Sequence, residues 1–228
     1  MIISHKYRFI FIKTRKTAGT STEIALSRFC GPDDVITPIT DEDEALRQSL
    51  GYPGPQNTQI PLGRFRPADW WNSLRQRKLV QFYNHAPASF VRDHIDPETW
   101  NSYFKFAFER NPFDRAISIY YWGGQNKERP PMSEWIRGGG LKSLRIPGIY
   151  VIDGKVAVDE IFRYEDLDGA MRTIAERLSL PEVPKLPMTK HKTRKDHRPY
   201  QEVLSEADLQ AIVDHCGEEF LERLGYSP

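Results

Sequence analysis

Residues 9–21 read FIFIKTRKTAGTS, an apolar run followed by a short basic loop rich in threonine. The run FIFI predicts a strand that is buried on both faces, as in a parallel sheet. Residues 22–29, TEIALSRF, predict a helix that ends before Gly31 and Pro32. A tight strand-to-helix turn directs backbone N–H groups and the positive end of the helix dipole at one point. The stretch therefore predicts an α/β fold with an anion site in this loop.

The loop also carries a positive charge, Lys16, and side-chain hydroxyl donors. These are Thr17, Thr20 and Ser21. A Walker A loop places its lysine after the second glycine, whereas Lys16 precedes Gly19. This order disfavours a standard P-loop NTPase. The alternative interpretation is an ordinary polar connection in which a threonine or serine caps the helix.

A second strand–loop–helix pattern begins at residue 104. Residues 104–108, FKFAF, predict another buried strand, and residues 113–122 predict an apolar helix with Pro112 at its first position. Arg110 then lies at the carboxyl end of the strand, the edge where open α/β sheets bind ligands. Its guanidinium group could bind a phosphate, with Ser118 as a further donor, or form a salt bridge at the helix start.

The two segments together resemble the sulfotransferases, most closely their carbohydrate-type branch, sulfotransferase family 2. That family's 5′-phosphosulfate loop reads approximately Pro-Lys-Thr-Ala-Gly-Thr-Ser, matched here by residues 16–21 with Arg15 in place of the proline. Its 3′-phosphate motif reads Arg-Asn-Pro-aromatic-Asp-Arg with a later helical serine, matched by residues 110–115 and Ser118.

Two later stretches agree with the resemblance, which spans nearly the whole chain. Residues 158–167, VDEIFRYEDL, are similar to the family's late strand segment, and residues 219–226 are similar to its closing helix. The resemblance implies a P-loop-like three-layer α/β fold, with a short central parallel sheet, helices on both faces and a small peripheral hairpin. It also implies a sulfotransferase that moves a sulfuryl group from 3′-phosphoadenosine 5′-phosphosulfate (PAPS) to a hydroxyl acceptor, a carbohydrate or another small alcohol.

In this frame the donor nucleotide would contact both loops and a third segment. The 5′-phosphosulfate would be bound by Arg15, Lys16, Thr17, Ala18, Gly19, Thr20 and Ser21, and the 3′-phosphate by Arg110 and Ser118. A basic loop at 189–199 would close over the nucleotide as a lid, through Lys190, Lys192 and Arg194. The alternative interpretation of this charged run is a solvated linker between helices.

The reaction needs charge relief at the leaving oxygen and a base for the acceptor hydroxyl. Lys16 is the candidate for the first task, and no metal is required because Lys16 and the helix dipole supply positive charge. His85 is the candidate base: it follows a predicted strand at 79–83, its ordinary pKa is ~6.5, and a His also occurs in some carbohydrate 2-O-sulfotransferase-like enzymes. A structural histidine is the alternative. Rival bases are Glu109, for which an ion pair with neighbouring Arg110 is expected, and the carboxylates around Glu165.

The composition fits one sulfotransferase-like domain over residues 1–228, with an irregular proline-rich insertion at 51–67. The 32 basic and 31 acidic residues nearly cancel, which argues against a nucleic-acid partner. No stretch is apolar enough to span a membrane or to act as a signal peptide, so a cytoplasmic enzyme is expected. Cys30 and Cys216 predict buried thiols rather than a metal pair. The oligomeric state stays open.

Other patterns predict the peripheral elements. A helix at 68–78 carries Trp70 and Trp71, for which packing in the core is the favoured interpretation over sugar stacking. Further predicted elements are a β-hairpin at 150–156 and amphipathic helices at 168–178 and 205–224. Two other functions remain open: a nucleotide or small-molecule kinase, which would need magnesium-binding carboxylates, and a non-catalytic nucleotide-binding protein.

Overall fold

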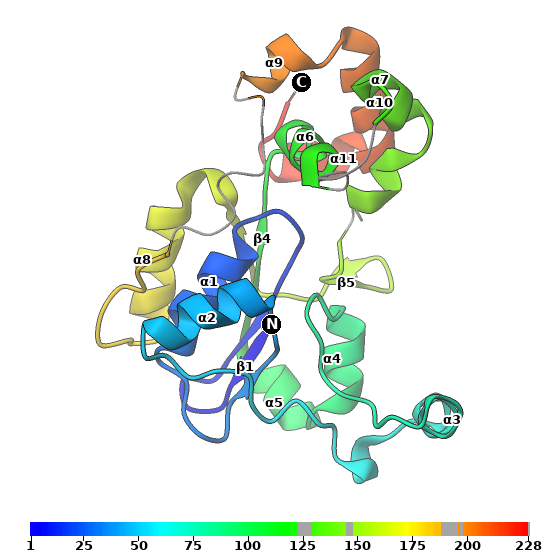
Figure 1. Cartoon of the computed structure of the whole chain (residues 1–228). Helices are drawn as coiled ribbons and strands as arrows, with labels where there is room; N and C mark the ends of the chain where they lie inside the picture. Colours follow the sequence, from blue (N-terminus) through cyan, green and yellow to red (C-terminus); the bar gives the residue numbers. More distant parts are fainter. Residues whose placement is uncertain (123–128, 145–147, 188–195, 197, 228) are drawn as a thin grey trace.

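The computed structural model describes residues 1–122, 129–144, 148–187, 196 and 198–227. A five-stranded sheet with the order β3-β1-β2-β4-β7 lies at its centre (Figure 1). The strands are β1 (Ile2–Ser4), β2 (Phe9–Ile12), β3 (Val35–Ile36), β4 (Phe104–Glu109) and β7 (Glu160–Arg163). The apolar runs at 9–12 and 104–108 thus form neighbouring strands, as predicted.

Three neighbouring strands, β2, β4 and β7, are parallel. Phe9 pairs with Phe104 and Phe106 pairs with Glu160. Parallel strands are covered on both faces, which explains why β2 and β4 are almost continuously apolar. The predicted short parallel sheet is confirmed for these strands. The sheet also contains β1, which the sequence did not predict and which runs antiparallel to both β2 and β3.

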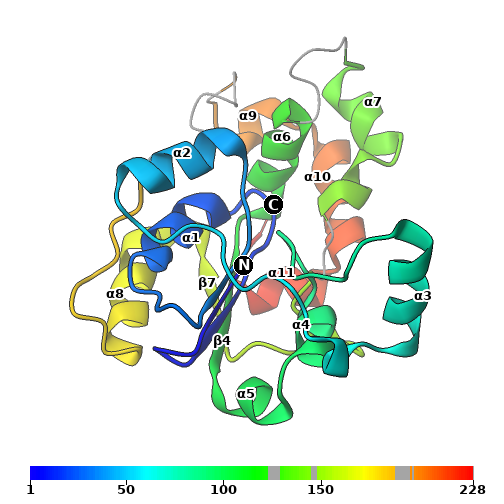
Figure 2. The same ribbon diagram turned by 60° about the horizontal axis from the view of Figure 1, so that its bottom comes forward.

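Helices cover both faces of the sheet (Figures 1 and 2). Those next to the sheet are α1 (Gly19–Ser27), α2 (Asp41–Ser49), α4 (Ala88–His94), α5 (Pro97–Ser102) and α8 (Leu167–Arg177). Side chains alternate along β2, so that Phe9 and Phe11 pack with side chains of α1 and α8. Ile10 and Ile12 pack on the opposite face with side chains of α4. The three-layer prediction is therefore confirmed.

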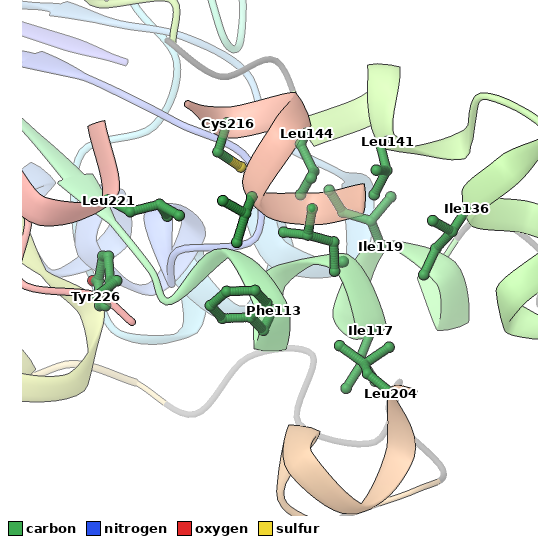
Figure 3. Close-up of a cluster of buried hydrophobic side chains, with 13 residues drawn as sticks. Phe113, Ile117, Ile119, Ile136, Leu141, Leu144, Leu204, Cys216, Leu221 and Tyr226 are labelled. Atoms are coloured by element: carbon green, nitrogen blue, oxygen red, sulfur yellow. The ribbon is translucent and has the colours of Figure 1, made fainter. Parts of the chain in front are cut away.

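A helical cluster lies beyond the carboxyl end of β4 (Figure 1). It contains α6 (Pro112–Trp122), α7 (Met132–Arg137), α9 (Tyr200–Val203), α10 (Glu206–Cys216) and α11 (Glu218–Arg223), with a 3-10 turn at Gly140–Leu144. Figure 3 shows its buried interior, where Phe113 and Ile117 of α6 lie near side chains of the neighbouring helices. This cluster fixes the direction of α6 and hence the loop that precedes it.

Two predictions about secondary structure need correction. The predicted strand at 79–83 is wrong, because only an isolated bridge between Gln59 and Gln81 forms there. The predicted helix at 205–224 is interrupted at Gly217, whose φ of 84° separates α10 from α11. The hairpin prediction is confirmed by β5 (Val151–Ile152) and β6 (Lys155–Val156).

The packing prediction for the two tryptophans is also wrong. They lie on α3 (Pro67–Gln76), where Trp70 is 53% exposed and Trp71 is 68% exposed. The proline-rich stretch before α3 contains a 3-10 turn at Leu62–Arg64. Another such turn, Tyr164–Asp166, joins β7 to α8. Among the described residues, no helix combines the length and the apolar character needed to cross a membrane.

Candidate functional site

The loop between β2 and α1 has an unusual backbone. Lys16 has a φ of 62° and Ala18 a φ of 58°, both in the left-handed region that residues with a Cβ rarely adopt. Ala18 is the N-cap residue of α1 and has no side-chain oxygen, so the alternative of a threonine or serine cap is wrong. The first N–H groups of α1 therefore receive no cap from the residue that usually supplies one. Such a terminus can accept an anion.

Close packing beneath the loop requires glycine at position 19. A Cβ at Gly19 would lie 2.7 Å from Cγ of Lys13. Lys13 cannot easily move, because its Nζ donates a 2.7 Å hydrogen bond to Glu23 and both side chains are buried. Burial alone would raise the pKa of Glu23, but the surrounding cations hold that pKa below its usual value. Lys13 thus anchors the start of α1.

One hydroxyl connects the first loop to the neighbouring strand. The Thr14 hydroxyl donates to the backbone carbonyl of Phe108, near the end of β4. Thr14 has only one hydroxyl proton, so the hydroxyl of Thr17, at 2.8 Å, donates to Thr14 Oγ1. Thr17 is fully buried, and its side chain supports the loop from within. Ile12 pairs with Ala107, so the two loops leave the same edge of the sheet side by side.

The second loop is organised around Asn111. Its Oδ1 accepts hydrogen bonds from the backbone N–H groups of Phe113 (3.0 Å) and Asp114 (3.3 Å). The N–H of Asn111 donates to Glu165 Oε1 at 2.8 Å. The N-terminus of α6 is therefore capped by the Asn111 side chain. The guanidinium carbon of Arg110 lies 4.3 Å from the centre of the Tyr164 ring, which orients this side chain at the sheet edge.

The rival bases are held in structural contacts. Glu109 is fully buried and accepts a 2.6 Å hydrogen bond from Arg115, so the expected ion pair with Arg110 is wrong. Burial raises the pKa of Glu109, and Arg115 opposes that rise. The other oxygen of Glu165, Oε2, accepts a hydrogen bond from the Tyr226 hydroxyl at 2.8 Å. These carboxylates brace the second loop and its surroundings.

His85 lies beside the first loop, although no strand precedes it. Its Nδ1 is 2.8 Å from the carbonyl oxygen of Lys13. A carbonyl only accepts, so Nδ1 carries the proton and Nε2 keeps its lone pair in the neutral ring. Burial lowers the pKa of His85 to about 4, so the neutral form dominates near pH 7. The left-handed φ of 60° at His85 gives a third such residue at this site.

A small cavity connects these groups. Its volume is about 10 Å³, room for roughly one water molecule. It is lined by Thr14, Arg15, His85, Arg115 and Ile149, so the first loop, His85 and the buried Arg115 meet there. A larger cavity of about 240 Å³ lies between the β5–β6 hairpin and the end of α10 and α11.

The structure places most of the predicted site residues on the two adjacent loops and at the start of α1. Lys16 reaches toward the end of α6, where its Nζ is 5.8 Å from the centre of the Trp122 ring. Ser118, on the same helix, is buried with 8% exposure. Thr20 is half-buried and Ser21 buried at the start of α1. The predicted lid residues Lys190, Lys192 and Arg194 lie outside the described residues.

Several supporting residues were not predicted. These are Thr14, Glu23, Arg115 and Trp122, which contact the first loop or β4, each through a contact that only the fold creates. The sequence contains one signal of these contacts. Glu23 is a charged residue on an otherwise apolar helix face, and a buried charge requires a partner. Among the described residues, no group of three or more His, Cys, Asp or Glu side chains could hold a metal ion.

Comparison with known proteins gives one family and one relative. Residues 1–141, more than half of the chain and including both loops, match the sulfotransferase family. The chain is also 27% identical over 101 residues to an uncharacterized protein of Archaeoglobus fulgidus, an alignment that covers 42% of this chain and 84% of that protein. No solved structure gives a significant match. Because the family match extends over both strand–loop–helix units and everything between them, the chain belongs to the sulfotransferase family.

Proposed function

We propose that this protein transfers a sulfuryl group from PAPS to a hydroxyl acceptor, within one domain that spans the chain. One observation carries the proposal: two loops leave the same sheet edge side by side, and they offer two different kinds of anion partner. The first loop precedes an uncapped N-terminus of α1, and the second presents Arg110. PAPS has two anionic ends, and two separate sites suit it better than a linear triphosphate.

The 5′-phosphosulfate would bind at the first loop. Backbone N–H groups from Ala18 to Ser21 would donate to it, together with the Thr20 hydroxyl. Arg15, which lines the small cavity, would add charge. Thr17 would contribute through its backbone and by holding the loop, because its hydroxyl is already bound to Thr14.

The 3′-phosphate would bind at the second loop. The guanidinium group of Arg110 can bind two phosphate oxygens at once, and Ser118 would add a hydroxyl donor. The ring of Tyr164 supports Arg110 from one face and leaves its N–H edge for the ligand. The segment with Lys190, Lys192 and Arg194 would then cover the nucleotide.

Lys16 would act where charge develops. As the bond from sulfur to the bridging oxygen breaks, that oxygen becomes negative, and an ammonium group close to it lowers the barrier. The contact between Lys16 Nζ and the Trp122 ring supports a position of this ammonium group between the first loop and the end of α6.

His85 would remove the proton of the acceptor hydroxyl. Its hydrogen bond to the Lys13 carbonyl selects the tautomer with a lone pair on Nε2, which is the form a general base needs. A pKa of about 4 makes this a weak base in the free protein. A bound anionic donor would raise that pKa, because a neighbouring negative charge favours the protonated ring.

Nucleotide binding tests the donor assignment. The product of PAPS, adenosine 3′,5′-bisphosphate, should raise the free energy of unfolding by about 2.7 kcal/mol at a concentration ~100-fold above its Kd. ATP with magnesium at the same concentration should raise the free energy of unfolding less, because its charges lie on one end of the molecule. An equal or larger thermal shift with magnesium ATP would favour a kinase and contradict the donor assignment.

The base assignment has its own test. His85→Ala should keep nucleotide affinity and lose ~100-fold or more in turnover. The wild-type free energy of unfolding should also rise with pH between about 4 and ~6.5, because in this range the unfolded chain binds the additional proton at His85. His85→Gln should flatten this pH dependence. Normal turnover in both variants would assign His85 a structural role.

The acceptor class can be found directly. The family resemblance favours a carbohydrate hydroxyl, and a screen of sugars, lipids and small alcohols with labelled PAPS would detect the sulfated product by its mass gain. Bisphosphate binding without turnover across the screen would support a non-catalytic nucleotide-binding protein.

A further inference from the structure

Residues 61–79 leave the body of the protein and return to it. The two ends of this excursion lie side by side, because the N–H of Ile60 donates to the Val80 carbonyl at 3.2 Å and the N–H of Phe82 donates to the Thr58 carbonyl at 2.8 Å. Between them lies α3, which both views place at the outer edge of the molecule, far from the sheet (Figures 1 and 2). The excursion is therefore closed at its base and exposed at its tip.

Ion pairs hold the first part of the excursion in place. Arg64 pairs with Asp96 at 2.5 Å, and Arg66 pairs with Asp93 at the end of α4. At the start of α3 the Asp69 carboxylate accepts a 2.7 Å hydrogen bond from the backbone N–H of Arg66. These polar contacts, with a contact between the Phe65 and Trp70 rings, fix the orientation of the helix.

The orientation of α3 is the reverse of the usual one. Asp69 faces the protein, is only 8% exposed, and hydrogen-bonds to Nε2 of His94 at 2.8 Å. At 100° per residue, Trp70, Trp71 and Leu74 lie on the other side of the helix. Their exposed fractions are 53%, 68% and 77%. A surface helix normally turns its apolar side inward. This helix turns it toward solvent.

These side chains form part of a larger apolar surface. Five of the nine large hydrophobic residues that are exposed in the described part of the chain lie between residues 62 and 79: Leu62, Trp70, Trp71, Leu74 and Leu79. Single exposed apolar side chains are common, but a cluster in one short segment indicates a contact surface. A binding partner of this surface must accommodate tryptophan as well as leucine side chains.

Positive charge follows directly along the chain. Arg75, Arg77 and Lys78 are exposed, and none of them forms an ion pair with another described residue. The acidic residue of α3, Asp69, is bound to His94 and does not offset them. An apolar face with tryptophan, bordered by uncompensated basic residues, suits the interface of an anionic lipid bilayer. A second copy of the chain would instead bring two basic borders together.

We propose that α3 and its flanks, residues 62–79, are a docking surface for anionic lipid bilayers. Trp71 and Leu74 enter the interface, and Arg75, Arg77 and Lys78 contact the lipid phosphates and carboxylates. The inference does not depend on the identity of the donor or of the acceptor. It implies that the protein can work at a membrane surface without a spanning helix among its described residues.

Vesicle sedimentation tests the proposal with the whole chain. The protein should sediment with phosphatidylcholine vesicles that contain phosphatidylserine and remain in solution with phosphatidylcholine alone. High salt should release it, since the basic residues act through screened charge. Bromine-labelled lipid tails in the vesicles should quench tryptophan fluorescence, because bromine quenches only on close approach. The absence of sedimentation at low salt would overturn the proposal.

Two variants separate the apolar and the charged contributions. Trp71→Ser with Leu74→Ser should weaken partitioning at least about tenfold, and neutralising Arg75, Arg77 and Lys78 to glutamine should weaken it by about fivefold per charge. The matched control is Leu50→Ser with Val183→Ser, which removes exposed apolar side chains elsewhere. Equal loss in the control would contradict the proposal.

Two further measurements separate lipid binding from misfolding and from self-association. All variants should keep the wild-type circular dichroism spectrum and a cooperative thermal melt, which shows that they fold. Light scattering should give the same mass for the wild type and the Trp71 and Leu74 variant. A dimeric wild type and a monomeric variant would assign the surface to a second copy of the chain and overturn the proposal.

Discussion

Two strand–loop–helix units of this protein have the same topology, but their helices begin in different ways. The first runs from β2 through Lys16 to α1, and the second from β4 through Arg110 to α6. In the first unit the helix begins at Gly19, after the left-handed N-cap residue Ala18, which has no capping side chain. In the second it begins at Pro112, which has no N–H, and Asn111 occupies the next free N–H groups.

The comparison suggests two ways in which a sheet edge could bind an anion. An uncapped helix start can use its own backbone N–H groups and dipole, and then needs an unusual loop conformation to present them. A capped helix start has no N–H groups left, so a side chain such as Arg110 must supply the charge. The first kind of site depends on backbone shape and the second on side-chain identity. Each kind fails under a different substitution.

The largest effect is expected at the first unit. Lys16→Ala should lower turnover by roughly 100- to 1,000-fold, the scale seen when a donor to developing charge is removed. Donor affinity should change much less, because the backbone N–H groups remain. Steady-state kinetics and nucleotide titration measure both quantities. Lys155→Ala, on the exposed hairpin, is the matched control. An equal loss in affinity and in turnover efficiency, with normal maximal rate, would make Lys16 only an anchor.

The next effect tests the second unit. Arg110→Ala should weaken the binding of adenosine 3′,5′-bisphosphate by roughly 1.5–3 kcal/mol, the value of a charge-assisted contact. The binding of adenosine 5′-phosphate should hardly change, because it lacks the 3′-phosphate. Calorimetric titration of both ligands gives the difference, with Arg172→Ala on the exposed side of α8 as control. If both ligands weaken alike, Arg110 is a structural residue.

A substitution at Ala18 tests whether backbone shape is what matters in the first unit. Ala18→Gly should retain binding, because glycine adopts the left-handed region without cost. Ala18→Val should lose more than about 1–2 kcal/mol of stability or binding, because a branched Cβ is strained at a φ of 58°. Thermal melts and bisphosphate titrations of the two variants measure this contrast. Similar behaviour of valine and glycine would show that the loop conformation is unimportant.

The smallest effect concerns the cap of the second unit. Asn111→Ala should lower the free energy of unfolding by about 1 kcal/mol, as for other lost N-caps. The affinity for adenosine 5′-phosphosulfate, which lacks the 3′-phosphate, should stay the same, since the first unit is untouched. Denaturant unfolding and ligand titration provide the two values. A large loss of adenosine 5′-phosphosulfate affinity would mean that the two loops do not act separately.

The sequence predicted the units themselves because each carries a strong local signal. Continuous apolar strands, Pro112 at a helix start and the basic loop are all visible within about a dozen residues. Sequence reasoning failed where the outcome depends on distant parts of the chain. Residues 79–83 have a strand-like composition, but the only pairing formed in the described structure there is a bridge from Gln81 to Gln59. The short strand β1 has three residues and no pattern long enough to detect.

The candidate site residues were predicted from the sequence, but the contacts among them were not. His85 was predicted as a candidate base because it follows a predicted strand, and that strand does not form. His85 lies beside the first loop because α4 packs on Ile10 and Ile12, which brings the preceding turn to the Lys13 carbonyl. The orientation of α3 was missed because a sequence shows which side of a helix is apolar, but not whether that side faces the protein or the solvent.

The contact under Gly19 has a consequence for how this sequence can change over time. Any side chain at position 19 must displace Lys13, and a shortened residue at 13 would leave Glu23 without its 2.7 Å partner. Substitutions at these three positions are therefore tolerated together and harmful one at a time. Aligned relatives should show covariation among positions 13, 19 and 23, and loops grafted from other proteins should function only when all three are transferred.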